Sequence, residues 1–160
     1  MRRAGLAIAV ALVGALLGGC TWATPTPAGP GQAQLAALPE AALLYPGAAV
    51  LEQGGRDARP EGGTDRPIPA VVGATLGAQA TPAEIVAFYD RELLARGWAR
   101  FTSPPIASAL EIRTAGWGRG GLSFRLGVYR PKDEPDPRLP PLEVRRQYAT
   151  IFRFIIEPPR

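Results

Sequence analysis

The chain offers few side chains that could perform catalysis. It contains no histidine, which is the commonest general base and metal ligand, and its single cysteine is Cys20. The three serines, Ser103, Ser108 and Ser123, therefore lack the usual histidine partner, and none lies in a G-x-S-x-G elbow. The only lysine, Lys132, lies in a proline-rich stretch where we expect it to be solvated. We therefore expect no catalytic residues and no enzyme activity.

Two further motifs match known ligand sites only in part. Residues 116–121 (GWGRGG) satisfy the G-x-G-x-x-G pattern of dinucleotide sites, but that pattern must open a helix. The residues that follow, LSFRLGVYR, alternate with period two, so we expect a mobile hairpin turn instead. Asp133, Glu134 and Asp136 could present oxygens to Ca²⁺, but they lack the EF-hand spacing and its glycine, which favours a solvated acidic loop. We expect neither a metal site nor a cofactor.

The charge distribution argues against a nucleic-acid partner. The formal net charge is +4, and it falls to +2 if Arg2 and Arg3 are removed with a signal segment. The remaining basic residues are almost all arginines spread among acidic residues, whereas phosphate backbones are bound by clustered basic patches.

The first residues have the pattern of a secretory signal. Arg2 and Arg3 are followed by the uncharged apolar run 4–17 (AGLAIAVALVGALL). A membrane-spanning helix needs about 20 apolar residues, so this run is short for an uncleaved anchor, which is the alternative interpretation. We expect export and removal of residues 1–19.

The end of this run resembles the lipobox of bacterial lipoproteins. Leu17, Gly18 and Gly19 directly precede Cys20, as a branched apolar residue and two small residues do in that motif. The resemblance implies that the Cys20 thiol receives a diacylglyceryl group, that cleavage falls between Gly19 and Cys20, and that the new amino group can receive an acyl chain such as palmitate. It also implies a lipid-anchored protein, on the outer leaflet of the plasma membrane or on an outer membrane. A free thiol at Cys20 is the alternative.

Composition divides the rest of the chain into a tether and one domain. Residues 21–39 carry no charge and are mostly Thr, Pro, Ala, Gly and Gln, a composition that buries too little surface to become ordered. We therefore predict a lipidated, flexible tether over 20–39 and a single domain over 40–160. A domain of this length can hold one hydrophobic core.

The clearest element of the domain is a helix over 81–96. Thr81 can cap it, Pro82 suits the first helical position, and Glu84 completes a capping box. Gly97 is suited to end it in a left-handed conformation.

Period-two alternation predicts strands around this helix. We expect a central strand at 148–157, because it is apolar on both faces apart from Arg153. Further strands are expected at 48–52, 71–78, 98–101, 110–114 and 122–129, and loops at 54–69 and 131–141. The prediction is an α+β fold: an antiparallel sheet of five to six strands with one helix on one face, in the order strand, strand, helix, then four strands.

The residues 43–48 (LLYPGA) and 83–98 (AEIVAFYDRELLARGW) resemble a recurrent small domain of bacterial envelope lipoproteins. A second resemblance is to the helix-on-sheet modules of outer-membrane assembly lipoproteins, which carry a further helix late in the chain. These resemblances bear on the fold. One short helix over a sheet is only enough to fill its own core, so we expect a membrane-anchored, non-enzymatic module that binds another envelope protein, through the sheet face opposite the helix or an edge strand. A small-ligand or lipid-binding lipoprotein is the alternative.

Alternation also places three arginines on the expected outward face of the sheet: Arg113, Arg125 and Arg153. They could pair across strands with Glu111 and Glu157, or they could form an anion-binding face for an acidic partner or for phosphate-bearing envelope polymers.

Overall fold

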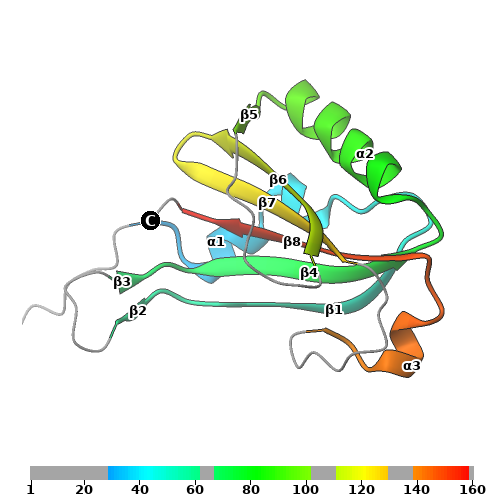
Figure 1. Cartoon of the computed structure of the whole chain (residues 1–160). Helices are drawn as coiled ribbons and strands as arrows, with labels where there is room; N and C mark the ends of the chain where they lie inside the picture. Colours follow the sequence, from blue (N-terminus) through cyan, green and yellow to red (C-terminus); the bar gives the residue numbers. More distant parts are fainter. Residues whose placement is uncertain (1–28, 62–66, 102–110, 130–138, 159–160) are drawn as a thin grey trace, which may run out of the picture.

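The computed structural model describes residues 29–61, 67–101, 111–129 and 139–158, without the side chains of 111–114. Figure 1 shows a twisted sheet with the long helix α2 over one face and the short helix α3 on the other side. The elements are α1 (Gln32–Ala36), the 3₁₀ helix η1 (Pro39–Ala42), β1 (Ala49–Arg56), β2 (Arg59–Pro60), β3 (Pro67–Ile68), β4 (Val71–Ala78), α2 (Pro82–Ala95), β5 (Ala99–Phe101), β6 (Glu111–Arg119), β7 (Leu122–Tyr129), α3 (Leu142–Arg145) and β8 (Thr150–Glu157).

The main sheet is six-stranded in the order β1-β4-β8-β7-β6-β5, and each pairing is antiparallel. The α+β class and the helix packed on one face are therefore confirmed. β8 lies inside the sheet, as its apolar pattern on both faces predicts, and Arg153 is its exposed residue. β2 and β3 form a separate two-stranded ribbon that continues the β1–β4 hairpin, seen at the left of Figure 1.

The helix α2 has the predicted caps at both ends. The Glu84 N–H donates to Thr81 Oγ1 at 3.3 Å, and the Thr81 N–H donates to Glu84 Oε2 at 2.8 Å. At the other end Gly97 has a φ of 78°, and the Trp98 N–H donates to the Leu93 carbonyl at 3.0 Å. This Schellman arrangement turns Trp98 back into the core, where it is buried.

The capping box makes the free energy of unfolding depend on pH in the acidic range. Hydrogen bonds from the Thr81 backbone and then its hydroxyl hold the pKa of Glu84 below its ordinary value of 4.5. The stabilisation is therefore complete above pH 4.5 and is lost as the pH falls through the lower folded value. We expect Glu84→Gln to lose less unfolding free energy than the parent between neutral pH and about pH 3, measured by urea denaturation. Parallel pH profiles for the two proteins would contradict this.

Aromatic rings fill the space between α2 and the sheet. Tyr89 of α2 lies with its ring centroid 5.5 Å from that of Phe124 in β7, and Phe124 stacks on Phe154 of β8 at 5.2 Å. Tyr89 donates its hydroxyl to the Leu43 carbonyl at 3.1 Å, and burial raises the pKa of this phenol. A packed aromatic layer thus forms the centre of the core between α2 and the sheet.

Residues 29–39 are ordered, although they lie in the predicted flexible tether. The composition of 20–39 predicted a flexible segment, but α1 packs on the sheet and its Leu35 is 0% exposed. The Gln32 N–H also donates to Asp57 Oδ1 at 2.8 Å, which holds this segment near the end of β1. That part of the tether prediction is wrong, because one leucine buried against β4 orders a stretch of small residues.

Two other elements differ from the sequence prediction. The expected loop 54–69 contains the last part of β1 and the β2–β3 ribbon. The sequence did not predict α3, whose segment places Leu139 and Tyr148 against Ile151 on the sheet face opposite α2. The other expected loop, 131–141, lies mostly outside the described residues.

The glycine motif 116–121 forms a hairpin and does not open the helix that the dinucleotide pattern requires. β6 continues through Arg119, and only Gly120 and Gly121 turn, with φ of 55° and 73°. No helix follows, because β7 begins at Leu122. The hairpin prediction is confirmed, with a shorter turn than expected.

Candidate functional site

The β1 edge of the sheet presents a long exposed stretch of strand. β1 is the outermost strand beside β4, and no described strand pairs with its other side. Its register with β4 shifts between Val50 and Glu52, where Leu51 bulges, and is regular from Glu52 to Arg56. All residues of this regular stretch are exposed. An antiparallel pairing occupies the N–H and C=O groups on one side only, so the remaining ones face outward.

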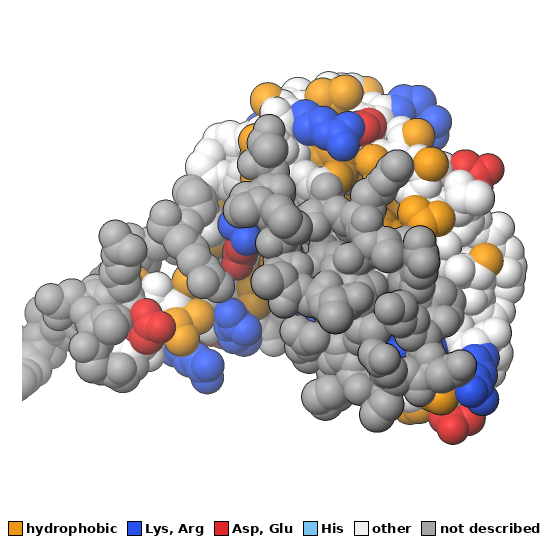
Figure 2. Space-filling model, viewed as in Figure 1, with side chains coloured by type: hydrophobic (Ala, Val, Ile, Leu, Met, Phe, Trp, Pro, Cys, Tyr) orange, Lys and Arg blue, Asp and Glu red, His pale blue; other side chains and the backbone are white. Residues whose placement is uncertain are grey.

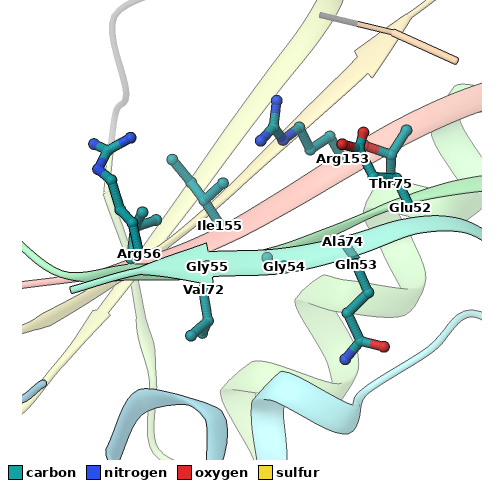
Figure 3. A pocket seen from close by; sticks show the side chains of 12 residues that line it. Glu52, Gln53, Gly54, Gly55, Arg56, Val72, Ala74, Thr75, Arg153 and Ile155 are labelled. Carbon is teal, nitrogen blue, oxygen red and sulfur yellow. The ribbon is translucent and has the colours of Figure 1, made fainter. Parts of the chain in front are cut away.

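A groove of about 280 Å³ lies on the outer face, which we define as the sheet face opposite α2, carrying Glu52, Thr75, Arg153 and Ile155. Figure 3 shows Arg56, Ile155 and Arg153 projecting from this face, while Val72 and Gln53 project from the opposite one. We call this hollow the outer groove. It is lined by Glu52, Gln53, Gly54, Gly55, Arg56, Val71, Val72, Gly73, Ala74, Thr75, Arg153 and Ile155.

Two paired glycines form the floor of the outer groove. Gly54 of β1 lies opposite Gly73 of β4, so neither strand contributes a side chain there. A Cβ on Gly73 would lie 2.3 Å from the Phe154 carbonyl oxygen, whereas a Cβ on Gly54 would meet no described atom within 4 Å. Gly73 thus permits close strand packing, and Gly54 leaves open space beside the edge.

A second hollow of about 190 Å³ lies on the opposite face of the same strands, which we call the inner groove. It lies between β1 and the N-terminal segment that the sequence assigned to the tether. Its lining residues are Gln32, Ala36, Ala41, Gln53, Gly54, Val72 and Gly73. The β1 edge therefore has a hollow on each face, at the same two glycines.

The predicted arginine face is present in part. Arg153 and Arg125 both lie on the outer face, and Arg125 Nε is 3.6 Å from Glu157 Oε1. Cross-strand pairing with Glu157 therefore holds for Arg125. The side chains of Arg113 and Glu111 lie outside the described part; the Arg113 backbone pairs with Val128 of β7.

Sequence reasoning missed Arg56 as a residue of this surface, because the glycines before it suggested a loop. Arg56 and Arg153 both line the outer groove, and neither is ion-paired with another described residue. Glu52 lines the groove as well, so its charged side chains carry a net +1.

Two other arginines serve the fold instead. Arg119 reaches the fully buried Glu40 at 3.1 Å and lies over the Trp98 ring at 5.0 Å from its centroid. In the same way Arg100 pairs with Asp90 and lies over Trp117, whose Nε1 donates to Asp90 at 3.0 Å. On the surface of α2, at the top of Figure 2, basic and acidic side chains lie beside one another. Such paired charges do not form a binding patch.

The lipobox residues Leu17, Gly18 and Gly19 and the candidate lipidation site Cys20 lie outside the described residues. Within the described residues no helix is both long and apolar enough to cross a membrane. The described acidic side chains form no group of three or more that could hold a metal ion. Among the residues that the structure describes, we take the β1 edge with its two grooves as the candidate site.

Comparison with protein-family models, with curated proteins and with solved structures finds no match to this chain.

Proposed function

We propose that this chain is an exported lipoprotein whose domain binds a partner protein by adding a strand to β1. The observation that carries the proposal is the exposed, regular stretch Glu52–Arg56 with a groove on each face. In strand addition the backbone hydrogen bonds supply affinity, while pockets that receive alternate side chains supply specificity. The two grooves lie beside β1 on the two sheet faces toward which alternate side chains of an added strand project.

The packed aromatic layer favours this function over a small-ligand or lipid-binding one. A ligand pocket between α2 and the sheet would need apolar lining in excess of what the core uses. Phe88, Tyr89, Phe124 and Phe154 fill that space with ring centroids 5.2 to 6.4 Å apart in their successive contacts. The exposed edge therefore supports the binding of a protein segment.

The anchor is tested by replacing the candidate lipidation site. We expect Cys20→Ala to stop lipid attachment, so that the protein leaves the membrane fraction or remains unprocessed. One buried acyl chain binds weakly and two or more bind almost permanently, so the loss should be nearly complete. Fractionation with mass analysis of the product is the measurement. A variant that is membrane-bound and has the parent's mature mass would overturn the anchor.

Strand addition is tested by site-specific photocrosslinking of the full chain in cells. A crosslinking amino acid at Glu52, on the exposed edge, should form a specific adduct, whereas one at the exposed Arg91 of α2 should not. Proline has no backbone N–H, and successive N–H groups point to opposite sides of β1. One of the two variants Gln53→Pro and Gly54→Pro therefore removes an outward N–H, and the other removes an N–H that faces β4. The variant that removes the outward N–H should keep the parent's stability and lose the adduct. Equal adducts at Glu52 and Arg91, or a Glu52 adduct that survives in both proline variants, would contradict strand addition.

A further inference from the structure

We propose that the partner strand carries a carboxylate side chain into the outer groove, where Arg56 and Arg153 bind it. This inference rests on the proposed strand addition, and it specifies the class of partner: an extended segment with an acidic residue opposite Gly54.

The register of β1 determines which partner residue enters the groove. Gly54 belongs to the outer-face row, together with Glu52 and Arg56, and it lies midway between them. A residue paired directly opposite Gly54 projects to the same face, because cross-strand pairs share a face. Gly54 has no side chain, and no described atom lies within 4 Å of the position that a Cβ would take there, so this partner side chain can lean across β1 toward Gly73.

The charges around this position favour a carboxylate. Arg56 and Arg153 stand on either side of Ile155 on the outer face in Figure 3. Both guanidinium groups lack an ion-pair partner among the described residues, in contrast to Arg125, Arg119 and Arg100. Guanidinium forks match the geometry of a carboxylate, and desolvation in a groove strengthens such bonds.

Glu52 restricts which position of the partner strand can carry an acidic residue. It lies two residues from Gly54, about 7 Å along the strand, and lines the same groove. An acidic residue directly opposite Glu52 would be repelled, whereas one opposite Gly54 lies on the side toward Arg56. We therefore expect one acidic residue in the partner's outer-face row at the Gly54 position, with a neutral or basic residue opposite Glu52.

A random nine-residue peptide library displayed on phage, selected against the purified full chain, supplies the probe. Some selected peptides should no longer bind the β1 proline variant that lacks the outward N–H. We expect these peptides to share one position at which Asp or Glu is enriched. For a synthetic peptide of this kind, replacing its Glu or Asp by the amide should weaken binding about tenfold. Added salt should weaken the acidic peptide more than the amide peptide.

Protein variants then locate the carboxylate. The double variant Arg56→Gln, Arg153→Gln should weaken binding of the acidic peptide about tenfold. Binding of the amide peptide should change by less than about twofold, because only the carboxylate is coupled to the two arginines. Arg59→Gln with Arg91→Gln removes the same charge away from the groove and should have little effect. Gly54→Val adds a side chain at the groove, where a Cβ meets no described atom within 4 Å, and should also weaken binding of the acidic peptide.

The outcomes separate this inference from the proposed function. Peptides that require the β1 edge but bind equally as acid and amide would overturn the carboxylate and leave strand addition standing. An equal loss of affinity in the Arg59 and Arg91 control would likewise overturn the arginine site. Failure to select any peptide that depends on β1 would overturn strand addition, and the carboxylate inference with it.

Discussion

Arg119→Met is expected to lower the free energy of unfolding by about 3 kcal/mol, the cost of leaving a buried charge without its partner. Glu40 is 0% exposed, and Arg119 Nη2 lies 3.1 Å from its Oε1. Arg119 also donates to the Arg96 carbonyl at 2.8 Å, just past the last turn of α2. The arginine thus joins the β6–β7 hairpin, the end of α2 and η1.

The control for this prediction replaces both members of the pair. Arg119→Met with Glu40→Leu removes the buried charge together with its partner, so most of the lost stability should return. Urea denaturation of the parent, the single variant and the double variant measures both effects. A single variant within about 0.5 kcal/mol of the parent would show that Glu40 is hydrated without Arg119.

Phe124→Ala is expected to cost about 3 to 5 kcal/mol, the usual range for truncating a buried phenylalanine. Its ring centroid lies 5.2 to 6.1 Å from those of four other aromatic side chains, Phe154, Tyr89, Trp117 and Trp98. The surrounding rings belong to α2, to two strands and to the residue that follows the helix cap, and packed rings collapse only partly into a cavity.

Phe124→Leu is the matched comparison, because it keeps an apolar side chain in the same space. It should cost clearly less than the alanine variant in the same denaturation experiment. A cost below about 1 kcal/mol for Phe124→Ala would indicate spare volume between α2 and the sheet. That result would favour the small-ligand alternative over a protein-binding module.

Local patterns were sufficient to predict α2 and β8. The helix carries its own signals in Thr81, Pro82 and Gly97, which act on neighbouring residues and need no tertiary partner. The apolar pattern of 148–157 has only Arg153 as a clear break, and a strand that is apolar on both faces belongs inside a sheet.

Elements stabilised by distant contacts were misplaced or missed. Leu35 is the buried anchor of α1, yet its neighbours Ala33, Gln34 and Ala36 have the composition of a linker. We predicted that the first strand ends at residue 52, because Gly54 and Gly55 suggest a turn when only local sequence is considered. In the structure β1 continues to Arg56. Its eight residues match the length of β4, so the partner strand was the available signal.

The candidate site was predictable only in outline. Alternation correctly placed Arg125 and Arg153 on the face opposite the core. Strand order is determined by long-range pairing, so the sequence could not show that β1 forms an edge or that Arg56 lies two strands from Arg153. The groove itself depends on Gly54 lying opposite Gly73, which is a consequence of the β1–β4 register.

Amide hydrogen exchange of β1, with and without a selected peptide, tests strand addition most directly. In the free chain, alternate amides between Glu52 and Arg56 should exchange rapidly, because only every second one donates to β4. Bound peptide should slow those rapid amides by at least about tenfold and leave the opposite edge, β5, unchanged. Unchanged exchange in β1 under saturating peptide, or protection confined to β5 or α2, would contradict strand addition.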